Sequence, residues 1–235
     1  MKTHPDIRSH NPPGGLARLV AAIGMTIGIT IGAHAPCHVL AATLPPPPPP
    51  PPGIATGARL SAPAFSPQEW KLPEGTTLAD TAIAITTEKT NARLQYLPAL
   101  SGNILVQARL KNVNNNHNVS LRIGGALALG FNSQYRKITL VTLDKGRIQT
   151  PALVELPYPD GRIPAETPSD FVLTLALRDG KASAWIDARQ IIADIAIPDF
   201  VAPPWRIDFT SGWSSNWTLA DFAIFAIKPA PVPTS

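Results

Sequence analysis

Residues 173–187, LTLALRDGKASAWID, predict a β-hairpin and, through it, the fold class of the chain. Apolar residues alternate on both sides of Asp179-Gly180, a pair that favours the two-residue type I′ turn of tight hairpins. This turn makes Arg178 the partner of Lys181 and sets every pairing further from the turn. A slip of one residue would turn the apolar face of one strand to solvent, so the register is well specified.

The two faces of this hairpin differ in character. Its apolar face consists of Leu173, Leu175 and Leu177 on the first strand and of Ala182, Ala184 and Ile186 on the second. Its other face carries Trp185 opposite Thr174. We therefore expect the Trp185 side chain to be exposed and to serve a binding surface; the alternative is that a loop covers it.

The same alternation recurs along the chain in short runs separated by turn residues, and no window has a helical period. The runs are 82–87, 92–97, 103–111, 119–123, 126–131, 137–143, 152–156, 171–178, 181–187, 190–196, 205–210 and 217–227. Many short strands with turns between them predict an all-β antiparallel sandwich over residues 62–228, followed by a tail at 229–235.

The N-terminal part has the layout of an export signal. A basic start that ends at Arg18 precedes an apolar stretch at 19–33 and then small residues, which predicts a signal peptide over 1–42 with cleavage after Ala42. An uncleaved membrane anchor is the alternative. Eight prolines run from Pro45 to Pro52 and predict a disordered, Pro-rich linker over 43–61. We expect a periplasmic or extracellular protein.

Four segments together resemble the concanavalin A-like lectin/glucanase superfamily, in its laminin-G-like or 3-keto-glycoside-hydrolase-like style. They are EWKLPEGTTLAD (69–80), VSLRIGGALALGF (119–131), FVLTLALRDGKASAWIDARQI (171–191) and LADFAIF (219–225). The resemblance covers residues 62–228 and implies a jelly roll of two curved antiparallel sheets. It also implies glycan binding on the concave face or at the rim loops, often with calcium at the rim.

Residues for standard carbohydrate-cleaving chemistry are not apparent. Retaining glycosidases of this fold carry an E-x-D-x-x-E run, because two carboxylates must face each other about 5 to 5.5 Å apart. The chain has no such run, and its nearest acidic pairs, Glu155 with Asp160 and Glu166 with Asp170, fall in or beside expected loops. His117 is the only histidine after the expected cleavage point. We expect a non-catalytic protein, with a hydrolase or lyase of this fold as the alternative.

Aromatic and polar residues at expected turns supply the candidate glycan contacts. The candidate ligand-binding residues are Trp185, Trp213, Trp217, Asn216, Tyr135, Arg136 and Arg189. Flat aromatic rings can stack on sugar rings, while amide and guanidinium groups donate hydrogen bonds, and Tyr158 is a further possible platform. In the alternative interpretation, Trp213 and Trp217 plug one end of the sandwich.

Partners and cofactors follow from charge and composition. The formal charge of +4 is not gathered into a basic run, so nucleic acid is not an expected partner, and a membrane enters only through an uncleaved N-terminus. We expect no cofactor; calcium held by oxygens of Asn114, Asn115 and Asn116 with Asp144 or Asp187 is the alternative. The sequence thus predicts an exported carbohydrate-binding domain on a Pro-rich stalk. An envelope scaffold or protein-interaction module is a further alternative.

Overall fold

The computed structural model describes residues 47–88, 91–113, 117–132, 137–145, 147–158, 169–212 and 214–229. The expected signal peptide at 1–42 lies outside these ranges. The described residues form β-strands and no helix. The strands are β1 (Thr56–Arg59), β2 (Trp70–Lys71), β3 (Thr76–Ala79), β4 (Ala82–Thr86), β5 (Ala92–Leu100), β6 (Ile104–Val113), β7 (Ser120–Ile123), β8 (Leu127–Asn132), β9 (Lys137–Asp144), β10 (Arg147–Ile148), β11 (Val154–Pro157), β12 (Ser169–Arg178), β13 (Lys181–Ile186), β14 (Arg189–Ala196), β15 (Trp205–Ser211) and β16 (Asn216–Ile227).

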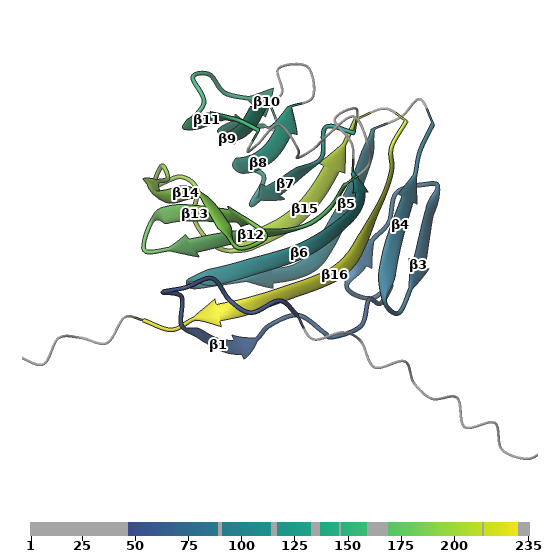
Figure 1. Ribbon diagram of the computed structural model, residues 1–235, viewed down its shortest axis with the longest axis horizontal. Helices are drawn as coiled ribbons and strands as arrows, with labels where there is room; N and C mark the ends of the chain where they lie inside the picture. The colour runs from purple at the N-terminus through teal and green to yellow at the C-terminus, as the bar shows by residue number, and fades with distance from the viewer. Residues whose placement is uncertain are drawn as a thin grey trace, which may run out of the picture. The chain divides into compact units, whose positions relative to one another are not determined.

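The strands build two antiparallel sheets. Sheet A has the order β14-β13-β12-β6-β16-β4-β3, with β1 paired to β16. Sheet B has the order β10-β9-β8-β7-β15-β5-β2, with β11 paired to β9. Figure 1 shows β9, β8, β7, β15 and β5 following one another across the upper part of the view, above β6 and β16. The expected all-β antiparallel sandwich of jelly-roll type is confirmed.

The core lies between the two sheets and is built by the alternation that predicted the strands. Leu94 and Ile207 face inward from sheet B and Val106, Leu175 and Ile224 from sheet A, and all five are fully buried. Burial of side chains such as these is worth roughly 1.5–3 kcal/mol each before entropy is subtracted. The inward faces therefore hold the sandwich together, and the outward faces are left to other functions.

The register of the opening hairpin is confirmed. Leu173, Leu175 and Leu177 pair with Ile186, Ala184 and Ala182 in turn, and Thr174 pairs with Trp185. Asp179 and Gly180 have φ values of 50° and 71°, which is the left-handed backbone that a type I′ turn requires at both positions. An Asp-Gly pair adopts this backbone at low cost, because glycine has no Cβ.

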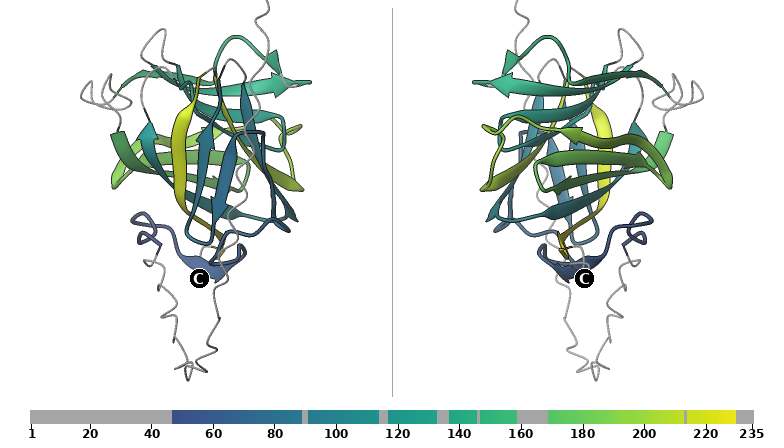
Figure 2. Two further views of the ribbon diagram at one scale, coloured as in Figure 1. Left: turned by 90° about the vertical axis from the view of Figure 1, so that its right-hand side faces the viewer. Right: turned by 90° about the vertical axis from the view of Figure 1, so that its left-hand side faces the viewer.

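The expected boundary between linker and domain is wrong. Strand β1 lies inside the predicted linker at 43–61, where Thr56 pairs with Ile227 and Arg59 with Phe225 of β16. In Figure 2, β1 lies beside the C-terminal end of β16. No proline falls between residues 53 and 62, so this part of the backbone can donate to a sheet. The other strands absent from the expected set, β2, β3 and β10, have two to four residues each.

Candidate functional site

The surface predicted around Trp185 is covered by protein. Trp185 lies on the outward face of sheet A, as its register requires, but its side chain is only 5% exposed. It packs in a small apolar cluster with Leu105, Ala176 and Ile227, and Ile54 packs against this cluster. The expectation of an exposed Trp185 platform is therefore wrong, and the alternative of a covering segment is correct.

The covering segment is residues 49–55, here called the N-terminal strap. Gln107 of β6 donates from Nε2 to the carbonyl of Pro49 at 3.3 Å, and the backbone N–H of Lys228 donates to the carbonyl of Ala55 at 2.8 Å. Between these contacts Pro51 is buried. Proline lacks a donor but keeps its carbonyl, so a Pro-rich segment can accept hydrogen bonds while it covers an apolar face.

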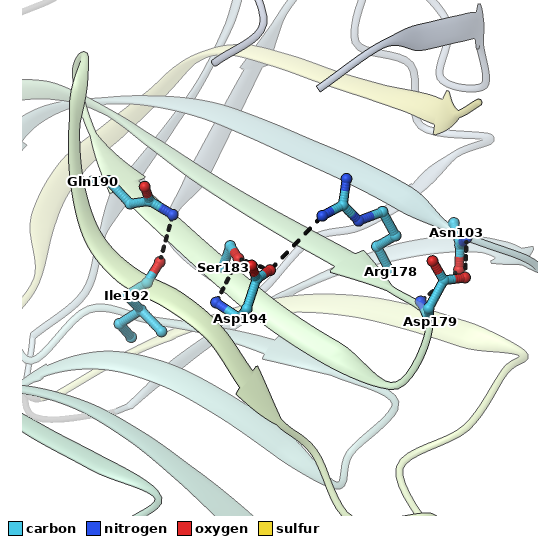
Figure 3. Close-up of polar contacts among 7 residues, drawn as sticks. All are labelled: Asn103, Arg178, Asp179, Ser183, Gln190, Ile192 and Asp194. Carbon is cyan, nitrogen blue, oxygen red and sulfur yellow. Dashed lines mark hydrogen bonds and ion pairs between the residues drawn. The ribbon is translucent and has the colours of Figure 1, made fainter. Parts of the chain in front are cut away.

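A pocket of about 220 Å³ remains between the strap and β12–β14, lined by Pro52, Ile54, Arg178, Ser183, Trp185 and Asp194. Three of its polar side chains, Arg178, Ser183 and Asp194, contact one another, as Figure 3 shows. The Ser183 hydroxyl donates to Asp194 Oδ1 at 3.1 Å and accepts from the Asp194 backbone N–H at 2.9 Å. Arg178 lies 3.8 Å from the same carboxylate. Lys181 and Gln190 complete the polar lining of this pocket.

The remaining predicted site residues do not gather at one place in the described structure. Trp217 is 1% exposed and faces the core near Phe209, so it is not an exposed platform; Tyr158 is buried too, with its ring centroid 6.4 Å from that of Phe131. Asn216 and Arg189 are exposed on β16 and at the start of β14. Trp213, Tyr135 and Arg136 lie outside the described residues. Ligand roles for these last five residues stay predictions.

The outer face of sheet B holds a hollow that the sequence analysis did not identify. It has a volume of about 520 Å³ and is lined by residues of β5, β7, β8, β9, β10 and β15, among them Arg93, Ser120, Arg122, Thr139 and Thr210. A second pocket of about 230 Å³ shares Arg93 with it and adds Gln95, Arg206 and Asp208. We call the two together the sheet B hollow.

Two rows of directly paired residues cross this hollow. The first row runs Arg93, Thr210, Ser120, Gly130 and Thr139 over β5, β15, β7, β8 and β9. The second row runs Gln95, Asp208, Arg122 and Ala128 over the first four of these strands. Strands in a sheet lie about 4.8 Å apart, so hydroxyl and charged groups of the two rows form one continuous polar floor.

Gly130 contributes no side chain to this floor, and the Ser120 side chain lies directly beside it. Gly130 lies between Ser120 and Thr139 in the first row, and a Cβ built on it would come within 2.5 Å of the Ser120 hydroxyl oxygen. A side chain here would displace that hydroxyl and fill the hollow. At the rim, Ile148 exposes 63% of its surface and supplies apolar area beside the polar floor.

A buried carboxylate organises the second row. Asp208 is 3% exposed and accepts from Arg93 at 2.7 Å and from Gln95 Nε2 at 3.3 Å. Arg122 is its direct neighbour on the other side, yet the Nε of Arg122 is buried without a hydrogen-bond partner. Burial and the charge of Arg93 lower the pKa of the Arg122 guanidinium, while Asp208 acts in the opposite direction.

Part of this site was visible in the sequence. Arg93 and Gln95 alternate with core residues in one predicted strand, as do Ser120 with Arg122 and Asp208 with Thr210 in two others. The alternation predicts that each pair faces away from the core. The pairing of β5 with β15, which are more than 100 residues apart, was not predictable from spacing.

His117 and Asp187, the latter one of the ligands named in the calcium alternative, make hydrogen bonds to the backbone. His117 is buried and its Nε2 accepts from the Asn216 backbone N–H at 3.4 Å; burial lowers its pKa, so it holds the loop as a neutral imidazole. Asp187 Oδ1 accepts from the Val172 N–H at 2.9 Å, and Asn114 to Asn116 lie outside the described residues. The described residues contain no group of three or more His, Cys, Asp or Glu placed to hold a metal.

None of the described residues forms a helix that is long and apolar enough to cross a membrane.

Comparisons with known proteins identify the fold. No protein-family model and no curated protein sequence matches the chain. The exoplasmic/lumenal domain of VIP36, in its Ca²⁺/Man3GlcNAc-bound form, aligns with a TM-score of 0.52 and 11% identity over 70% of this chain and 86% of that one. The carbohydrate recognition domain of Emp46p aligns in its metal-free form with a TM-score of 0.51 and 12% identity over 67% and 88%. Its potassium-bound form gives 0.50 and 13% over the same shares. At these identities the likeness shows the architecture, and the chain has the concanavalin A-like lectin fold that the sequence resemblance implied.

Proposed function

We propose that this domain binds a glycan, without cleaving it, in the sheet B hollow. The observation that carries the proposal is the polar floor of that hollow, in which hydroxyls of Ser120, Thr139 and Thr210 stand beside the guanidinium groups of Arg93 and Arg122. Sugars offer many hydroxyl donors and acceptors together with apolar ring faces. The polar floor can hydrogen-bond to the sugar hydroxyls, and the exposed Ile148 side chain can pack against an apolar ring face.

The fold neighbours support the same conclusion. VIP36 was solved with Ca²⁺ and mannose oligosaccharides, and the Emp46p domain is named as a carbohydrate recognition domain. The sheet B hollow is also the largest of the pockets described above, and the pocket beside Trp185 has less than half its volume. The difference in volume favours sheet B over sheet A as the glycan face.

The absence of an acid pair among the described lining residues supports binding without catalysis. Asp208 is the single carboxylate among the described residues that line the hollow, and it is held by Arg93 and Gln95. Hydrolysis by the common routes needs two carboxyl groups, one to donate a proton and one to attack or activate water. A divergent hydrolase or lyase remains the alternative that the experiment below decides.

We also infer that the protein is exported, from the signal-peptide layout of residues 1–42. Because the strap is bound to the domain from Pro49 onward, only the residues before Pro49 can act as a Pro-rich stalk. This stalk is shorter than the linker predicted over 43–61.

The test is retention of residues 43–235 on a panel of immobilised neutral and acidic polysaccharides, with Arg122→Ala as the site variant. We expect Arg122→Ala to weaken retention by tenfold or more, roughly the effect of losing one or two hydrogen bonds to a charged group. Arg178→Ala, on the outer face of sheet A, is the matched control and should bind like the parent. Loss at Arg178 with full binding at Arg122 would move the site to sheet A.

The same panel separates the alternatives. Release of new reducing ends or unsaturated sugars during incubation would show an enzyme. Failure to retain any polysaccharide, together with saturable binding of a protein partner, would favour the interaction module instead.

A further inference from the structure

The sheet B hollow carries more positive than negative charge. Arg93, Arg122 and Arg206 line it, and Asp208 is the one acid among the described lining residues. Glu155 stands next to Thr139 at the edge of the first row, but it forms an ion pair with Lys137 and so does not offset the arginines. A ligand in this hollow therefore meets a net positive surface.

One nitrogen of Arg122, its Nε, has no hydrogen-bond partner. Arg93 and Gln95 approach Asp208 from β5, each taking one of its two oxygens. Arg122 approaches from β7 on the other side and keeps its Nε buried and unpaired. A buried donor without a hydrogen-bond partner destabilises the site, and more so when the group is charged. Because Arg122 lines the hollow, an anion bound there would offset the repulsion between the Arg122 and Arg93 guanidinium groups.

The uncharged hydroxyl groups of the polar floor lie within reach of a ligand bound at Arg122. Ser120 is two residues from Arg122 on β7, so the two side chains emerge on one face roughly 7 Å apart along the strand. One acidic sugar can span this separation, with its anionic group at Arg122 and its hydroxyls at Ser120. Gly130, the cross-strand partner of Ser120, adds no side chain to this part of the floor.

We propose that the glycan bound in the sheet B hollow is acidic, and that its carboxylate or sulfate groups pair with Arg122. This inference rests on the proposed function, since it names the ligand class for the same site. It adds that charge, and not shape alone, selects the ligand.

The experiment compares polymers that share a backbone and differ in charge. The carboxylate arm uses polygalacturonate against its methyl ester, and alginate and hyaluronan against their carboxyl-reduced forms. The sulfate arm uses chondroitin sulfate against unsulfated chondroitin. Uncharged dextran, mannan and xylan complete the set. We expect at least one acidic member to bind roughly tenfold or more tightly than its matched partner, and to weaken as NaCl is raised from 50 to 500 mM.

A neutral variant tests the assigned residue. Arg122→Gln keeps a hydrogen-bonding group but removes the charge, so it should abolish the preference for the acidic polymer, whereas Arg178→Gln on sheet A should retain it. Melting temperatures of both variants check that they fold. If Arg122→Gln does not fold, the matched polymers and the salt series with the parent protein still decide the question.

The outcomes separate this inference from the proposed function. Equal binding of charged and neutral partners, or binding to neutral polymers only, overturns the acidic-glycan inference and leaves glycan binding in place. Retention of no polymer in the set overturns both. Acid-selective binding that Arg122→Gln leaves unchanged overturns the role of Arg122.

Discussion

At the scale of single residues, Trp185 shows that the face of a strand and exposure to solvent are separate properties. Alternation places its side chain outside the core between the sheets, and that assignment is correct. Its 5% exposure comes from Ile54 and the other members of its cluster, none of which lies within its own hairpin strand. Periodicity along one strand carries no information about a segment that crosses above it.

Trp185→Ala should therefore be destabilising, although the residue lies outside the main core. Truncating a buried tryptophan costs about 3–5 kcal/mol, and we expect the lower end here because the strap can partly follow the smaller side chain. Urea unfolding measures the change. Leu175→Ala, on the inward face, should cost about 2–5 kcal/mol, and Lys181→Ala, exposed beside the turn, less than about 0.5. A Trp185→Ala effect as small as that of Lys181→Ala would contradict the burial.

Asp208 is a polar residue for which the face of the strand also fails to indicate exposure to solvent. An aspartate in a predicted strand, one residue from a core position, suggests a solvated side chain. Here it is almost fully buried on the outer face, because arginine and glutamine side chains from the neighbouring strand cover it. Buried carboxylates in folded proteins are normally paired and hydrogen-bonded in this way.

At the scale of elements, the N-terminal strap connects a low-complexity segment to the fold. It covers Leu105, Trp185 and Ile227 on the outer face of sheet A, and strand β1 follows directly after it. An outward sheet face that carries this much apolar surface needs a cover in a monomer. The proline-rich composition hides that role, because it is typical of linkers.

A chain that begins at residue 56 should be less stable than one that begins at residue 43, because the strap no longer shields the apolar cluster. We expect a loss of about 2 kcal/mol or more, which lowers the melting temperature by roughly 4–8 °C in a domain of this size. Differential scanning calorimetry provides the measurement. A chain that begins at residue 47 is the control and should melt like the longer form. Equal melting of all three would show that the strap adds nothing to the fold.

At the scale of the whole molecule, the two sheets use their outer faces differently. Sheet A turns an apolar patch outward and covers it with the strap, while sheet B presents a hollow with a charged and hydroxylated floor. The strap thus occupies the face that the sequence suggested for ligands, and the open face is the other one. Both faces belong to a single sandwich with one large core.

The proposal that the protein is exported predicts a definite mature chain. Cleavage after Ala42 would leave a protein that begins at Thr43 and has no cysteine, since Cys37 is the only one. Intact mass and N-terminal sequencing of the protein from the exported fraction measure this directly. A mass that retains residues 1–42 in a membrane fraction would show the anchor interpretation instead.

The sequence by itself determined the all-β class, the register of the 173–187 hairpin, and which side chains of each strand face the core, because these depend on local periodicity and turn chemistry. It also carried the polar partners of the site, with Arg93 and Gln95 in one strand and Asp208 in another. Only the tertiary structure decided that these residues meet, because β5 and β15 pair across a long separation that leaves no local signal. The same holds for Trp185: its exposure depends on a strap more than 100 residues earlier in the chain, and the contact between them exists only in the folded molecule.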